Sequence, residues 1–118
     1  MKKKTVYIAM NSKYFKFREW ITKFAFEQDV IPINCLMVYG YYLYDMVPRE
    51  RIIEAYKTVV LKCDEIWIFG EISDGIREAM IIAKKSNIPR KFFDMTNYPT
   101  IVEISEDQAV WEEGVKFG

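Results

Sequence analysis

The stretch CDEIWIFGEISDGIREAM, residues 63–80, decides the fold class of this chain. An apolar run, Ile66 to Phe69, has the composition of a buried β-strand and ends at Gly70, before a short acidic loop. Ser73 or Asp74 then suits the N-cap of a helix that we expect over about residues 75–86. A buried strand that passes through a short loop into a helix is typical of a βαβ unit.

The rest of the chain repeats this alternation. We expect strands at residues 4–10, 30–38, 64–70, 88–94 and 100–104. We expect helices at residues 14–28, 48–62, 75–86 and 105–115, the first with an apolar stripe of Phe17, Trp20, Ile21, Phe24 and Ala25. The pattern predicts a single α/β domain over residues 1–118, a three-layer sandwich of the flavodoxin or Rossmann type. Its parallel five-stranded sheet should have the order 2-1-3-4-5, with helices on both faces.

Composition excludes several classes of function. The 17 basic and 17 acidic residues give zero formal net charge, so there is no basic field for duplex nucleic acid. No segment is apolar and long enough for a signal peptide or a membrane span, so we expect a cytoplasmic protein without a membrane partner. The chain has no histidine, which excludes Ser-His and Cys-His catalysis, and we expect neither a metal nor a cofactor. The 16% aromatic content predicts surface committed to a ligand or to a homo-oligomer.

A sheet of this order predicts where a ligand binds. The site should lie outside the carboxyl ends of the strands, between strands 1 and 3, where the strand order reverses. The segments after Met10, Val38 and Phe69 would line it. The candidate ligand-binding residues are Tyr7, Met10, Asn11, Ser12, Tyr39, Tyr41, Tyr42, Phe69, Gly70, Glu71, Ser73, Asp74, Gly75 and Glu78. The tyrosines could stack on a base or could form a subunit interface.

The loop GEISDGI, residues 70–76, is neither a phosphate-binding P-loop nor a G-x-G-x-x-G turn. Glu71 and Asp74 suit ribose hydroxyls better than a bare polyphosphate, because carboxylates accept hydrogen bonds from hydroxyls. Glu78, one turn into the helix, could attack or stabilise an anomeric carbon. An ordinary capped helix start is the alternative interpretation of the same residues.

Three stretches carry a family resemblance over about residues 4–93: KKTVYIAM (3–10), IPINCLMVYGYYLYDMVPRER (31–51) and VLKCDEIWIFGEISDGIREAMIIAKKSNIP (60–89). Together they resemble the nucleoside 2-deoxyribosyltransferase-like superfamily, in particular a small branch of it found in phages and bacteria. Characterised members cleave or exchange N-glycosidic bonds. They use a glutamate on the helix after strand 3, held by a tyrosine from strand 1, and acidic residues bind the sugar. The resemblance implies that Tyr7 is that tyrosine, that Asp64 is the strand-3 aspartate, and that residues 73–75 form the loop motif.

The sequence also departs from this family. The family glutamate lies four residues before a helical alanine, here Ala83, so its position is Ala79, and Glu78 lies about 100° around the helix from it. The loop after strand 1 (11–20) is bulky and aromatic where the family has a small loop. We therefore expect binding of a nucleoside- or nucleotide-derived small molecule without turnover. In a phage, such binding could sequester a nucleotide immune signal of the cyclic ADP-ribose type and so evade anti-phage defence.

Two alternatives remain open at the level of sequence. The first is an N-glycosidase or 2-deoxyribosyltransferase with Glu78 as the nucleophile, oriented by Tyr7. The second is a protein-interaction domain.

Overall fold

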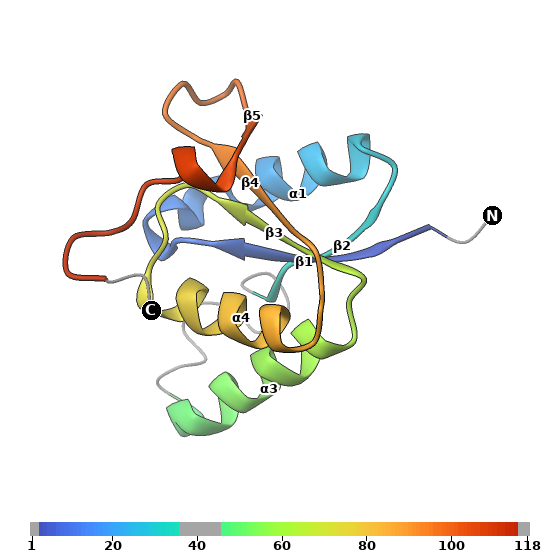
Figure 1. Cartoon of the computed structure of the whole chain (residues 1–118), viewed down its shortest axis with the longest axis vertical. Helices are drawn as coiled ribbons and strands as arrows, with labels where there is room; N and C mark the ends of the chain where they lie inside the picture. Colours follow the sequence, from blue (N-terminus) through green and yellow to red (C-terminus); the bar gives the residue numbers. More distant parts are fainter. Residues whose placement is uncertain (1–2, 36–45, 116–118) are drawn as a thin grey trace.

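The computed structural model describes residues 3–35 and 46–115 (Figure 1). Its strands are β1 (Thr5–Met10), β2 (Ile31–Ile33), β3 (Glu65–Phe69), β4 (Arg90–Asp94) and β5 (Val102–Ile104). Its α-helices are α1 (Arg18–Glu27), α3 (Arg49–Leu61) and α4 (Asp74–Lys85), and two 3-10 helices are η1 (Ser12–Phe17) and η3 (Glu106–Gln108). The chain is thus an α/β protein. No helix of the described residues is long and apolar enough to span a membrane.

The strands form one sheet in the order β2-β1-β3-β4-β5, which confirms the predicted order. β1 is parallel to β2 and β3, and β3 is parallel to β4. β5 instead runs antiparallel to β4, so the prediction of a purely parallel sheet is wrong at this edge. Only residues 95–101 separate the two strands, and a parallel crossover needs a dozen or more.

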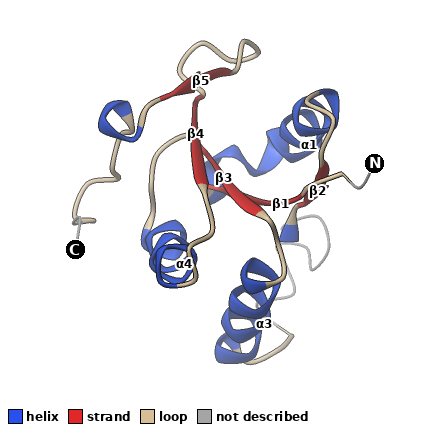
Figure 2. Cartoon of the chain, turned by 45° about the vertical axis from the view of Figure 1, so that its right-hand side comes forward, coloured by secondary structure: helices blue, strands red, loops and turns tan. Residues whose placement is uncertain are grey.

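Helices cover both faces of the sheet. Figure 2 shows α1 on one face and α3 with α4 on the other. Because successive strand residues point to opposite faces, β1 sends Tyr7 and Ala9 to the core under α3 and α4, and Val6, Ile8 and Met10 to the core under α1. β1 is therefore buried from both sides, as the apolar run in its sequence indicates.

The predicted helix at residues 14–28 is two elements, η1 and α1, rather than one. Ile21 and Ala25 are buried under α1, as predicted, but Trp20 is 59% exposed and its place in the apolar stripe is wrong. The buried side of α1 centres on Ile21 and Ala25, and a rotation of 100° per residue puts Trp20 well away from it.

The predicted helix at residues 105–115 is also wrong, since only Glu106 to Gln108 form a 3-10 turn. The Ser105 N–H donates to Gln108 Oε1 at 3.0 Å, as a capping box requires, but the chain then straightens. The Ile72 N–H donates to the Val110 carbonyl and the Glu112 N–H to the Ile72 carbonyl, both at 2.9 Å. Residues 110–112, here called the 110–112 strap, are therefore fixed against the loop after β3.

Two turns place the start of α4. Gly70 ends β3 with φ +80°, and a Cβ there would lie 2.3 Å from Cε2 of Tyr14. Ser73 caps α4, as predicted, because its Oγ accepts a hydrogen bond from the Ile76 N–H at 3.3 Å. At the other end of α4, Asn87 adopts φ 58° and acts as the predicted stop.

Candidate functional site

A cavity of about 320 Å³ opens at the carboxyl end of β1, beside the N-terminus of α4. The described residues that line it come from β1, from Ser12 in η1, from Cys35 after β2, from α3, from α4 with its cap Ser73, and from the 110–112 strap. They are Tyr7, Ile8, Ala9, Met10, Ser12, Cys35, Arg49, Tyr56, Ser73, Asp74, Gly75, Ile76, Ala79 and Glu112. The cavity therefore lies at the reversal of strand order between β1 and β3.

A second cavity of about 240 Å³ adjoins the first between α3 and α4. The two share Tyr7, Arg49, Tyr56, Asp74, Gly75 and Ala79. Ile53, Lys57, Val60 and Glu78 border only the second cavity, whereas Ser12, Ser73 and Glu112 border only the first. The first cavity thus holds the polar end of the site, and the second extends it along an apolar groove.

Tyr7 lies at the centre of this arrangement. It is buried, it borders both cavities, and it is hydrogen-bonded to the thiol of Cys35. Burial raises the pKa of Cys35 to about 11, although the hydrogen bond with Tyr7 acts in the opposite direction. Cys35 is therefore a neutral thiol near pH 7 and not a nucleophile.

The structure brings together six of the predicted ligand-binding residues at the first cavity: Tyr7, Met10, Ser12, Ser73, Asp74 and Gly75. The N-terminus of α4 borders the cavity, and a Cβ added at Gly75 would meet no atom within 4 Å. The backbone of this helix start is therefore open to a ligand.

Other predicted residues have structural roles instead. Phe69 is fully buried and stacks on Phe93, with ring centroids 4.7 Å apart. Gly70 lies against the Tyr14 ring, and the Glu71 carboxylate pairs with Lys13 at 2.5 Å. None of these three predicted residues borders either cavity. The predicted contacts of Tyr39, Tyr41 and Tyr42, and the segment after Val38, lie outside the described residues.

Glu78 carries the carboxylate next in sequence to the position where the resemblance places the catalytic glutamate, and Ala79 occupies that position itself. The Glu78 side chain is 52% exposed, and its Oε1 pairs with Nη1 of Arg77 at 3.2 Å. Glu78 borders the second cavity only, together with Tyr7. Ala79 is buried and borders both cavities. The helix therefore presents a methyl group to the cavity at the position where the resemblance places a carboxylate.

Residues 5–93 match the model of a protein family described as a domain of unknown function, DUF7768. The chain belongs to the DUF7768 family. No curated protein matches the chain. The match includes β1, β2, β3, α4 and all of β4 except Asp94, so the DUF7768 region supplies most of the cavity lining. The 110–112 strap lies beyond the match.

Sequence reasoning missed the residue that the strap adds to the DUF7768 site, Glu112. Its Oε2 accepts a hydrogen bond of 2.6 Å from Nδ2 of Asn11. Asn11 was predicted to contact a ligand; it is buried, it is not among the residues that line the cavity, and it holds Glu112. No local pattern around Glu112 indicates this contact, which joins residues 101 positions apart. The sequence analysis also did not predict that Arg49 and Tyr56 line the cavities, because the ordinary amphipathic spacing of α3 does not distinguish them from its other residues.

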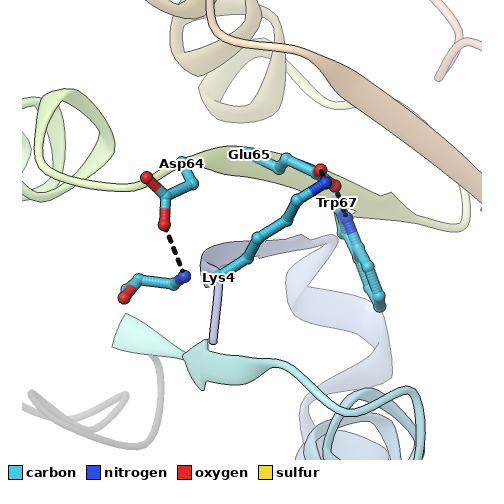
Figure 3. Close-up of polar contacts among 5 residues, drawn as sticks. Lys4, Asp64, Glu65 and Trp67 are labelled. Carbon is cyan, nitrogen blue, oxygen red and sulfur yellow. Dashed lines mark hydrogen bonds and ion pairs between the residues drawn. The ribbon is translucent and has the colours of Figure 1, made fainter. Parts of the chain in front are cut away.

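Asp64 directly precedes β3, so it lies at the amino ends of the parallel strands, whereas the cavity lies at their carboxyl ends. Its Oδ2 accepts a hydrogen bond of 2.8 Å from the Thr5 N–H (Figure 3). Beside it the buried Glu65 pairs with Nζ of Lys4 at 2.6 Å and accepts a hydrogen bond from Nε1 of Trp67 at 2.8 Å. These carboxylates join β3 to β1 and do not contact the cavity.

The described part of the chain contains no candidate metal site. Among residues 3–35 and 46–115, no three side chains of the acidic, cysteine or histidine type lie close enough to hold one. The described lining offers carboxylates, serine hydroxyls and backbone N–H groups for hydrogen bonding, the Arg49 guanidinium, and tyrosine rings.

Proposed function

We propose that this DUF7768 protein binds a nucleoside- or nucleotide-derived small molecule in the first cavity and does not turn it over. The observation that carries the proposal is the presence of Ala79 in the wall of both cavities, beside Tyr7. The family resemblance assigns this position to the catalytic glutamate. The pocket is thus retained where the nucleophile is not.

The size and lining of the cavity suit such a ligand. A volume of about 320 Å³ falls within the range of small-molecule sites. Ser12, Ser73 and Asp74 form a polar end that matches the hydroxyls of a sugar. Tyr7 and Tyr56 border both cavities and offer an aromatic wall to a planar base. In a phage, the same site would allow the protein to sequester a nucleotide signal of the host.

Glu78 favours a second candidate function. It borders the second cavity with Tyr7, so a ligand that reaches into that groove would lie near a carboxylate. This arrangement supports an N-glycosidase or a 2-deoxyribosyltransferase. Against it, the Glu78 carboxylate is more than half exposed and pairs with Arg77, whereas a nucleophile is held toward the reacting carbon.

The test is a binding and turnover assay with a defined panel. The panel contains nucleosides, ribonucleoside 5′-monophosphates, ADP-ribose and cyclic ADP-ribose. Calorimetry measures affinity, and mass spectrometry after denaturation shows whether the bound compound is recovered intact. We expect tight binding of at least one panel member and intact recovery. No binding to any member would refute the proposal, and release of free base that Glu78→Gln abolishes would establish the second candidate instead.

A matched pair of variants locates the site. Gly75→Leu places a side chain at the cavity, where a Cβ meets no atom within 4 Å, so the fold should be retained and affinity should fall at least about tenfold. Lys85→Leu places the same leucine side chain at the exposed far end of α4, away from the cavity. It should bind like the wild type. Equal affinities of the two variants would place the ligand elsewhere.

A further inference from the structure

We infer that Glu112 is the sugar-hydroxyl acceptor of this site, and that it gives the protein a preference for ribo- over 2′-deoxyribo-ligands. The inference rests on the proposed function and names a specificity determinant within it. Glu112 lies outside residues 5–93, so this determinant is an addition to the DUF7768 region.

The position of Glu112 is fixed by its backbone. The Ile72 N–H donates to the Val110 carbonyl, and the Glu112 N–H donates to the Ile72 carbonyl, both at 2.9 Å. Ile72 is fully buried and directly precedes Ser73, the cap of α4. The strap is thus attached to the loop that forms the cavity, and it carries Glu112 into the lining.

Asn11 fixes the side chain of Glu112. Asn11 is only 4% exposed, and its Nδ2 donates to Glu112 Oε2 at 2.6 Å and to the Glu71 carbonyl at 3.4 Å. Its Oδ1 accepts from the Lys13 N–H at 3.1 Å, so both ends of the amide are engaged. A rotation of Asn11 would break these bonds inside the protein. Asn11 is therefore a positioning residue that holds the carboxylate in one orientation.

The carboxylate of Glu112 keeps acceptor capacity for a ligand. A carboxylate offers about four lone-pair sites, and Asn11 uses one of them. Lys13 lies near Glu112 but forms its ion pair with Glu71, and a second cation, Arg49, lines this cavity. A carboxylate with free lone pairs binds ligand groups that donate hydrogen bonds. Two vicinal sugar hydroxyls provide two such donors, and the neighbouring Ser12 and Ser73 hydroxyls mark this as the sugar end of the cavity.

Removal of one hydroxyl from the ligand would leave part of this acceptor unpaired. A hydrogen bond to a charged group contributes enough to change affinity by about 10- to 100-fold. We therefore expect the wild type to bind ribo-ligands about 10- to 100-fold more tightly than the matching 2′-deoxy compounds.

Paired calorimetry tests the inference, with ribonucleoside 5′-monophosphates, ADP-ribose and the 2′-deoxy counterpart of each as probes. Glu112→Gln should bring the ribo preference below about threefold while affinity for the 2′-deoxy probes changes little. Asn11→Ala should lower the preference in the same direction, which a purely structural role would not do. Glu113→Gln, one residue along and exposed, should keep the wild-type preference.

The outcomes separate this inference from the proposed function. Binding with no ribo preference, or a preference that survives in Glu112→Gln, overturns the role of Glu112 and leaves the binding function in place. Binding to no probe overturns both. If Glu112→Gln does not fold by circular dichroism, Glu112→Asp is measured instead, because its shorter side chain withdraws the carboxylate from Asn11 and should also reduce the preference.

Discussion

Gly70→Ala should destabilise the fold strongly, because Gly70 both ends β3 and lies against an aromatic ring. Its φ of +80° is disfavoured for any residue with a Cβ, by about 1–2 kcal/mol. The added Cβ would also lie 2.3 Å from Cε2 of Tyr14, so the half-buried ring must move. Overpacking of this kind usually costs about 1–3 kcal/mol. The free energy of unfolding should therefore fall by about 2–5 kcal/mol.

Gly75→Ala is the matched control. Gly75 lies in the first turn of α4, and a Cβ there meets no atom within 4 Å. Alanine is favoured over glycine in helices by up to about 1 kcal/mol, so this variant should be as stable as the wild type or more stable. Both substitutions restrict the unfolded chain to a similar extent, so the difference between them reports on the folded state.

Urea unfolding, followed by tryptophan fluorescence, measures the free energy of unfolding of both variants, and thermal unfolding provides a second measurement. The midpoint of thermal unfolding of Gly70→Ala should fall by about 8–20 °C, at about 4 °C per kcal/mol. In a Tyr14→Ala background the same substitution should retain only the backbone penalty of about 1–2 kcal/mol. A Gly70→Ala protein within about 0.5 kcal/mol of the wild type would refute the reasoning.

Two further predictions concern buried ionisable groups. Burial alone would raise the pKa of the Glu65 carboxyl, but hydrogen bonds from Lys4 and Trp67 outweigh it and hold the pKa below the ordinary 4.5. The stabilisation by ionised Glu65 is therefore fully present above pH 4.5 and is lost as the pH falls through the lower pKa of the folded protein. In urea titrations between pH 7 and pH 3, the free energy of unfolding should fall more for the wild type than for Glu65→Gln. Burial raises the pKa of Cys35 and of Cys63 to about 11, so little thiolate is present in the folded protein at pH 8. The folded protein should therefore react with a thiol reagent at pH 8 far more slowly than the protein unfolded in urea, and equal rates would contradict this.

Local signals in the sequence predicted the central part of the fold. The apolar run of β3, the Ser73 cap and the Asn87 stop depend on neighbouring residues alone, and all three are present in the structure. The direction of β5 was missed although the residues between β4 and β5 are too few for a crossover. The prediction of the last helix was wrong because its capping box forms only a single turn. After that turn, the backbone of Val110 and Glu112 forms hydrogen bonds with Ile72 instead of continuing a helix.

The candidate site was predictable only where it follows the sheet. Ser12, Ser73 and Gly75 were predicted to lie together because they follow β1 and β3, and all three line the first cavity. Glu112 follows no strand of the parallel part, and its contact with Asn11 depends on the path of the chain after β5. A pattern confined to one segment contains no information about such a contact.

The strap has a consequence for the order in which the protein becomes functional. During synthesis, β1, β3, α4 and β4 all emerge before residues 110–112. The hydrogen bonds that join Ile72 to Val110 and Glu112 can therefore form only near the end of synthesis. Under the proposed binding function, Glu112 reaches the cavity lining only at this point, so the competence to bind would be a late step of biosynthesis.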